Sequence, residues 1–212
     1  MDALVAANSW GNRIAKAISI VFHPIFIPSY SMFLLLNTDR VINALYDYDL
    51  KQQLVMVIFI GTTLLPIASI LVLRWRKTIT SFHLHDRKER AAPLGATLAF
   101  FFMTHSSLAA SGVDATITLM TINSVYIALA IVAITLFWKI SIHATAMGGV
   151  TASFLLISHN LSVNPILLAS SLVVLSGAVC YARIKTDAHQ PAQVYVGYLM
   201  GIAISLLTFL VL

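Results

Sequence analysis

Charged residues are scarce in this sequence: 10% of its 212 residues are Asp, Glu, Lys or Arg, whereas 59% are hydrophobic. A soluble domain carries about 25% charged residues, so the chain lacks the polar surface that water would require. Its single cysteine, Cys180, excludes an intrachain disulfide. Residues 1–16 are polar and mixed, and no small-residue cleavage site follows the first apolar run, which argues against a cleaved signal peptide. These absences indicate a protein whose solvent is mostly lipid.

The sequence contains long apolar runs in place of charged residues. A bilayer core about 30 Å thick needs roughly 20 apolar residues for each helical crossing. Several runs approach that length with little charge and without the alternating pattern of barrel strands, namely 17–37, 54–73, 91–111, 117–138, 143–158, 165–182 and 192–212. We therefore predict an all-α, polytopic transmembrane bundle of about seven helices. Residues 1–212 form a single domain that begins with the polar segment 1–16.

Two of these segments have unusual compositions. Segment 143–158 is short and rich in Ala, Gly and Ser, which favours close packing among neighbouring helices, so we expect it at the centre of the bundle. Segment 17–37 contains Pro24 and Pro28, and each proline removes a helical hydrogen bond and favours a kink. We interpret His23, beside this kink, as a buried group with its hydrogen bonds satisfied and not as a ligand.

The positions of the cationic residues predict the orientation. Seven crossings place most Lys and Arg residues on the side of the N-terminus, namely Arg13, Lys16, Arg74, Arg76, Lys77, Arg87, Lys88, Arg90, Lys139, Arg183 and Lys185. Arg40 and Lys51 fall on the other side. Cations concentrate in cytoplasmic loops, so the N-terminus is predicted to be cytoplasmic and the C-terminus outside. This clustering accounts for the net charge of +5 without a nucleic-acid partner.

Three polar clusters, at 86–90, 139–143 and 183–193, belong to helix ends on that same side. In a compact bundle they meet near the headgroups, where several cations and two imidazoles suit the binding of lipid phosphate. His189 and Gln193 stand four residues apart, so the amide is predicted to reach the imidazole. The competing interpretation is a set of interfacial cations that only anchor the helices.

The order of these residues resembles the signatures of the type 2 phosphatidic acid phosphatase superfamily. The third family signature is Arg, five residues, His, three residues and Asp, which Arg183, His189 and Gln193 approximate. Residues 141–143 look like the second signature, Pro-Ser-Gly-His, and residues 87–93 like a degenerate first signature. The likeness covers about residues 86–212, and several short sequence motifs are similar to those of a divergent bacterial branch of the superfamily.

The resemblance implies a lipid-phosphatase-like core of six helices in a bacterial inner (plasma) membrane, with the site facing the cytoplasm. It implies that His189 attacks phosphorus, that His143 protonates the leaving alcohol and that Gln193 orients His189. Phosphate-binding roles fall to Arg183, Arg90, Arg87, Lys139 and Ser141. No metal or other cofactor is expected. The substrate would be a phosphorylated membrane lipid of the phosphatidate, phosphatidylglycerophosphate or polyprenyl phosphate type.

Departures from the signatures favour a second interpretation. Gln193 replaces the family aspartate and supplies no negative charge, and Ile142 replaces a glycine. A catalytically silent relative that binds lipid headgroups, or an accessory subunit of a larger membrane complex, would tolerate both. Ser141 has its own alternative role as a helix N-cap. A transporter ranks third, because few charges lie within the apolar segments and no inverted repeat is detectable.

Overall fold

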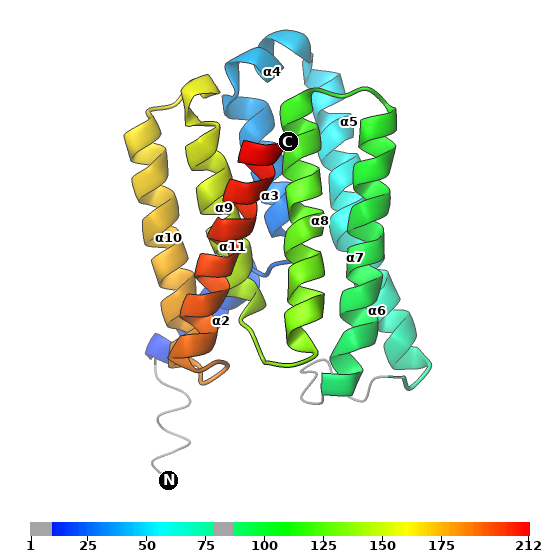
Figure 1. Ribbon diagram of the computed structural model, residues 1–212, viewed down its shortest axis with the longest axis vertical. Helices are drawn as coiled ribbons and strands as arrows, with labels where there is room; N and C mark the ends of the chain where they lie inside the picture. The colour runs from blue at the N-terminus through cyan, green and yellow to red at the C-terminus, as the bar shows by residue number, and fades with distance from the viewer. Residues whose placement is uncertain (1–9, 79–86) are drawn as a thin grey trace.

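The computed structural model describes residues 10–78 and 87–212, apart from the side chains of residues 87–90. Within these ranges the chain is all-helical, with no strand assigned, and an isolated bridge pairs Asp39 with Leu161. The helices run up and down between two ends of an elongated bundle (Figure 1). The upper end in that view carries the short α4 (Arg40–Leu45), and the lower end is where α10 (Pro165–Lys185) passes into α11 (Pro191–Val211).

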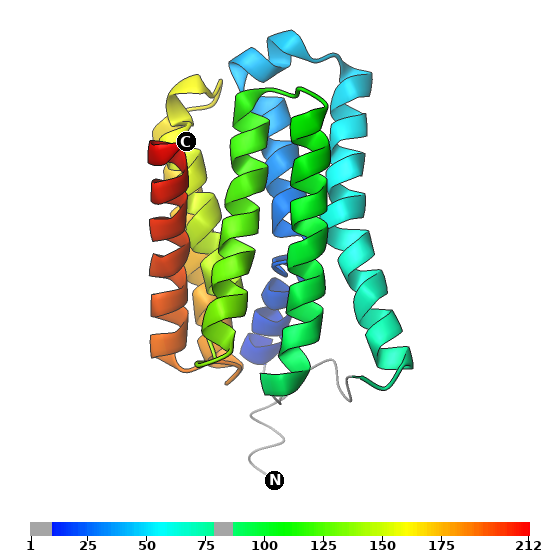
Figure 2. The same ribbon diagram turned by 45° about the vertical axis from the view of Figure 1, so that its right-hand side comes forward.

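Four helices in the described ranges are long and apolar enough to cross a membrane. They are the continuous helix Tyr48–Trp75, α8 (Ala115–Thr135), α10 and α11, whereas the apolar α9 (Ile142–Leu156) is shorter. Figures 1 and 2 both show α10 and α11 on one side of the bundle and α6 on the other. The predicted all-helical fold is confirmed, and the four apolar helices support a membrane protein.

The first apolar segment is interrupted where the prolines predict a kink. Its two parts are α2 (Trp10–Val21) and α3 (Ile27–Thr38). Pro24 lies in the break, and Pro28 lies in the first turn of α3. Backbone N–H groups in a first turn make no intrahelical hydrogen bond, so proline is tolerated there. The interruption leaves His23 outside both helices.

The second apolar segment begins earlier than predicted. The Asp47 carboxylate accepts a hydrogen bond of 2.8 Å from Leu50 N and caps α5 (Tyr48–Phe59), so the helix extends through polar residues that hydropathy alone assigns to a loop. The chain continues through a π-helical stretch, η1 (Ile60–Leu64), into α6 (Leu65–Trp75). Pro66 has no N–H to donate to the preceding turn, which accounts for the wider turn directly ahead of it.

Helix α9 lies at the centre of the bundle, as its small residues predict. It packs against α11, α10, α8 and α3, and most of its side chains are buried. A Cβ at Gly201 of α11 would overlap Thr145 O of α9, and a Cβ at Gly148 of α9 would overlap Tyr198 O of α11. The absence of side chains at these glycines therefore allows the two backbones to touch.

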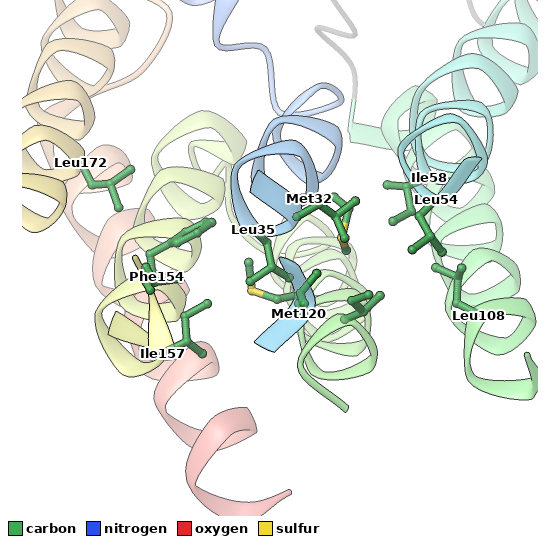
Figure 3. Close-up of a cluster of buried hydrophobic side chains, with 13 residues drawn as sticks. Met32, Leu35, Leu54, Ile58, Leu108, Met120, Phe154, Ile157 and Leu172 are labelled. Atoms are coloured by element: carbon green, nitrogen blue, oxygen red, sulfur yellow. The ribbon is translucent and has the colours of Figure 1, made fainter. Parts of the chain in front are cut away.

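A hydrophobic cluster fills the part of the bundle nearest the upper end. It includes Met32, Leu35, Ile58, Met120 and Phe154, which come from α3, α5, α8 and α9 (Figure 3). Helix α8 descends from Ala115, and α9 ascends to Leu156, so these residues all lie toward the same end. The polar clusters predicted from the sequence lie toward the opposite, lower end.

Candidate phosphate site at the lower end

Two of the three polar clusters meet at the lower end through the backbone. Ser141 N donates to Gln193 O over 3.2 Å, which joins the α8–α9 connection to the first turn of α11 (Figure 1). The third cluster begins α7 (Arg87–Ala110), which also starts at this end. The side chains of Arg87 and Arg90 lie outside the described part of the structure, so their predicted roles stay predictions.

The predicted contact between His189 and Gln193 is present. His189 Nδ1 lies 3.0 Å from Gln193 Oε1, and Gln190 N donates to the same oxygen over 3.2 Å. A backbone N–H can only donate, so the atom it meets is the amide oxygen, and His189 Nδ1 must then carry the proton. The lone pair of the neutral ring is consequently on Nε2. A histidine that attacks phosphorus through Nε2 needs this tautomer.

His143 is the second residue of α9 and is 8% exposed. Its Nε2 lies 3.0 Å from Ser19 O on α2, and because a carbonyl only accepts, Nε2 carries the proton and Nδ1 the lone pair. Arg183 and His189 are near enough to interact electrostatically with the His143 ring. The structure thus brings His143, His189 and Arg183 into one neighbourhood.

Arg183 occupies the last turn of α10 and is partly buried. Its backbone carbonyl accepts from His189 N over 3.3 Å, which fixes the turn that carries His189. Among the described residues, the buried Arg183 Nε has no hydrogen-bond partner, and neither does the buried Ser19 Oγ. Buried donors are nearly always satisfied, so an unused guanidinium N–H indicates a position where a ligand oxygen would bind.

Ser141 and Lys139 differ in burial: Ser141 lies in the interior, whereas Lys139 is half-buried. Ser141 is fully buried, and its Oγ caps α9 by accepting from Ala144 N over 3.4 Å, which is the N-cap alternative raised from the sequence. Its backbone contact with Gln193 O joins the α8–α9 connection to the first turn of α11. Lys139 lies half-buried in the connection before α9, at the same end of the bundle.

Sequence reasoning missed His23. Its ring lies edge-on to the His143 ring with 5.2 Å between centroids, and it interacts electrostatically with Arg183. The ring belongs to the break between α2 and α3 and is exposed, unlike His143. The proline-induced break signalled an irregular backbone at this point, but nothing in the sequence indicated which side chains His23 would meet.

A cavity of ≈ 550 Å³ extends from His23 and His143 into the bundle between the α2–α3 break, α6, α7, α8 and α9. Its lining is mainly aliphatic and aromatic, with Ile67, Phe101 and Ile131 as examples. Ligand cavities for small molecules typically have volumes of about 300–1,000 Å³. The two imidazoles at one end and hydrocarbon beyond them suit an amphiphile with a polar head.

Neither a protein-family description, nor a curated protein, nor a solved structure matches this chain. Among the described residues, no group of three His, Cys, Asp or Glu side chains is arranged to hold a metal ion. The groups that the site offers for chemistry are its imidazoles, the Arg183 guanidinium and the apolar cavity.

Proposed function

We propose that this chain is an integral membrane phosphatase that hydrolyses a phosphorylated membrane lipid through a phosphohistidine on His189. The observation that carries the proposal is the hydrogen-bonded tautomer of His189, which puts the lone pair on Nε2. Arg183, whose carbonyl holds the His189 backbone, adds a buried Nε–H without a hydrogen-bond partner among the described residues. A nucleophile held by a second side chain and an adjacent cation is the arrangement that phosphoryl transfer requires. The resemblance to type 2 phosphatidic acid phosphatases supports the same chemistry.

The reaction has two displacements. His189 Nε2 attacks phosphorus, the bond from phosphorus to the lipid oxygen breaks, and an acid in the site protonates the departing alkoxide. Water then attacks the phosphohistidine, the N–P bond breaks, and phosphate leaves as the lone pair returns to Nε2. Arg183 stabilises the charge on the phosphoryl oxygens in both steps, with Lys139 and the α7 arginines, Arg87 and Arg90, as further cations.

The apolar cavity supports a substrate with a hydrocarbon part. Its lining includes His23 and His143 as well as aliphatic residues such as Ile131, so a lipid with its phosphate near these two imidazoles would place a chain among apolar side chains. A lipid chain moves from the bilayer into this cavity at little cost because both surroundings are apolar, whereas a water-soluble phosphate has no group to fill it. This supports a lipid phosphate over a water-soluble one.

Release of inorganic phosphate from lipid phosphates by the purified protein in mixed micelles tests the proposal. His189→Ala should abolish release, whereas His159→Ala, a matched change of an exposed histidine in η2 (Ser158–Asn160) at the upper end, should leave it unchanged. Phosphate release that survives in the His189→Ala variant would remove that residue from the mechanism.

The second candidate is a catalytically silent relative that binds lipid headgroups, alone or as an accessory subunit of a larger membrane complex. The observation in its favour is that the partner of His189 is the Gln193 amide, which supplies no negative charge. Lipid-phosphate binding that is weakened in the Arg183→Met variant, together with an absence of phosphate release by the unaltered protein, would favour this candidate.

We further propose seven crossings of a bacterial inner membrane, with the N-terminus and the site in the cytoplasm and the C-terminus outside. The crossings would be α2–α3, α5–α6 and each of α7 to α11. In a Cys180→Ser background, an impermeant maleimide should label Asp49→Cys in whole cells. Lys185→Cys should react only after permeabilisation. Both parent residues are exposed and lie at opposite ends, and the reverse labelling pattern would invert the orientation.

A further inference from the structure

His23 and His143 differ in how their ring nitrogens are used. His143 Nε2–H donates to Ser19 O over 3.0 Å, and the residue is 8% exposed. His23 Nδ1 accepts only a long contact of 3.4 Å from Ile25 N, which places the proton on Nε2. Among the described residues no hydrogen bond engages His23 Nε2, so this N–H remains available to a ligand in the cavity that both rings line.

The proton donor of the first displacement must carry a positive charge before it gives up its proton. An imidazolium at His143 would be a charge buried beside Arg183, and its one established N–H is committed to a carbonyl. His23 also interacts with the positive charge of Arg183, but its side chain is exposed, and it can take up a second proton at Nδ1 by giving up only the weak contact with Ile25 N. The ring next to His143 is therefore better suited to the task than His143 itself.

We propose that His23 is the catalytic residue that protonates the leaving alcohol, and that His143 is a positioning residue that holds the α2–α3 break against α9. This inference rests on the proposed function. As the bond from phosphorus to the lipid oxygen breaks, the His23 imidazolium transfers its Nε2 proton to the departing alkoxide and becomes neutral. In the second displacement neutral His23 accepts a proton from the attacking water at Nε2, and the imidazolium is restored.

Leaving-group dependence distinguishes a proton donor from a structural histidine. A lipid alkoxide needs a proton in order to leave, whereas nitrophenolate leaves without one. His23→Gln should therefore lower kcat/KM, which reports the first displacement alone, by about 10²–10⁴-fold for phosphatidate and by less than about tenfold for p-nitrophenyl phosphate. His143→Gln should lower the two rates by similar factors, because it disturbs the geometry of the whole site.

A second variant distinguishes loss of the proton donor from loss of folding. Imidazole added to His23→Ala should restore phosphatidate hydrolysis severalfold, because the cavity has room for the missing ring. The selective loss appearing in His143→Gln and not in His23→Gln would overturn the assignment, as would equal losses on both substrates in His23→Gln. Failure of the unaltered protein to hydrolyse either substrate would instead overturn the proposed function together with this inference.

Discussion

The amide of Gln193 sets how well His189 can act as a nucleophile, and Gln193→Glu tests this directly. The glutamate side chain has the same length, so its carboxylate can keep the 3.0 Å contact with His189 Nδ1 and the 3.2 Å contact with Gln190 N. The position is in the first turn of α11, where the helix dipole favours a negative charge. The substitution should therefore preserve the geometry of the site while adding a charge.

The size of the effect follows from the charge that His189 gains as it attacks. A neutral hydrogen bond contributes about 0.5–1.5 kcal/mol, and one to a charged group about 1.5–3 kcal/mol. The midpoints of these ranges differ by about 1.25 kcal/mol. Present mainly in the transition state, this difference corresponds to roughly an eightfold increase in kcat. An upper bound comes from serine proteases, in which the converse change from Asp to Asn lowers kcat about 10⁴-fold. Desolvation of the carboxylate at this buried position keeps the gain near the lower figure.

Initial rates of phosphate release from a lipid phosphate in mixed micelles measure this change. Gln193→Leu, which removes both hydrogen bonds, should lower kcat by about 10–100-fold and serves as the opposite control. The reasoning is refuted if Gln193→Glu is no faster than the unaltered protein while Gln193→Leu retains full activity. An increase that persists when His189 is replaced by Ala would show that the carboxylate acts elsewhere.

Three further variants separate function from packing. Arg183→Met should lower phosphate release by about 10²–10³-fold, while the melting temperature stays level or rises because a buried N–H without a partner is removed; a lower melting temperature would contradict this. Gly201→Ala should destabilise the detergent-solubilised protein by about 1–3 kcal/mol because the new Cβ overlaps Thr145 O, whereas Gly177→Ala, with open space around it, should be neutral or slightly stabilising. Ala128→Phe should fill part of the cavity and raise KM for phosphatidate but not for p-nitrophenyl phosphate, and an equal rise for both would argue against a chain site.

Several features of the fold follow from local patterns in the sequence. Hydropathy located the long apolar helices, and the small residues of 143–158 indicated the close contact that Gly148 and Gly201 make possible. The spacing of four residues was enough to place Gln193 against His189, because both belong to one turn of chain. Each of these inferences used residues within a single helix or at its end, where the geometry is nearly fixed.

Features that depend on contacts between distant segments were not predictable in the same way. A local cap is missed as well: hydropathy does not register the hydrogen bond from Leu50 N to the Asp47 carboxylate, so α5 begins earlier than predicted. His23 was interpreted as a satisfied buried residue, but it is exposed and lies against His143, 120 positions away along the chain. That contact depends on how α2 packs beside α10 and α9, which a proline-induced break permits but does not specify.

The close approach of α9 and α11 couples the packing of the bundle to its chemistry. Ser141 begins α9 and donates its N–H to Gln193 O, and Gln193 in turn holds His189. The same two helices touch through Gly201 farther along α11, so a side chain there would push α11 outward and lengthen the contact at its first turn. Phosphoryl transfer is sensitive to a displacement of about 1 Å between the reacting groups. Phosphate release should therefore fall in the Gly201→Ala variant under conditions in which that protein is still folded. Gly177→Ala, on α10, should leave both properties intact, and this contrast would locate the link between stability and activity in the α9–α11 contact.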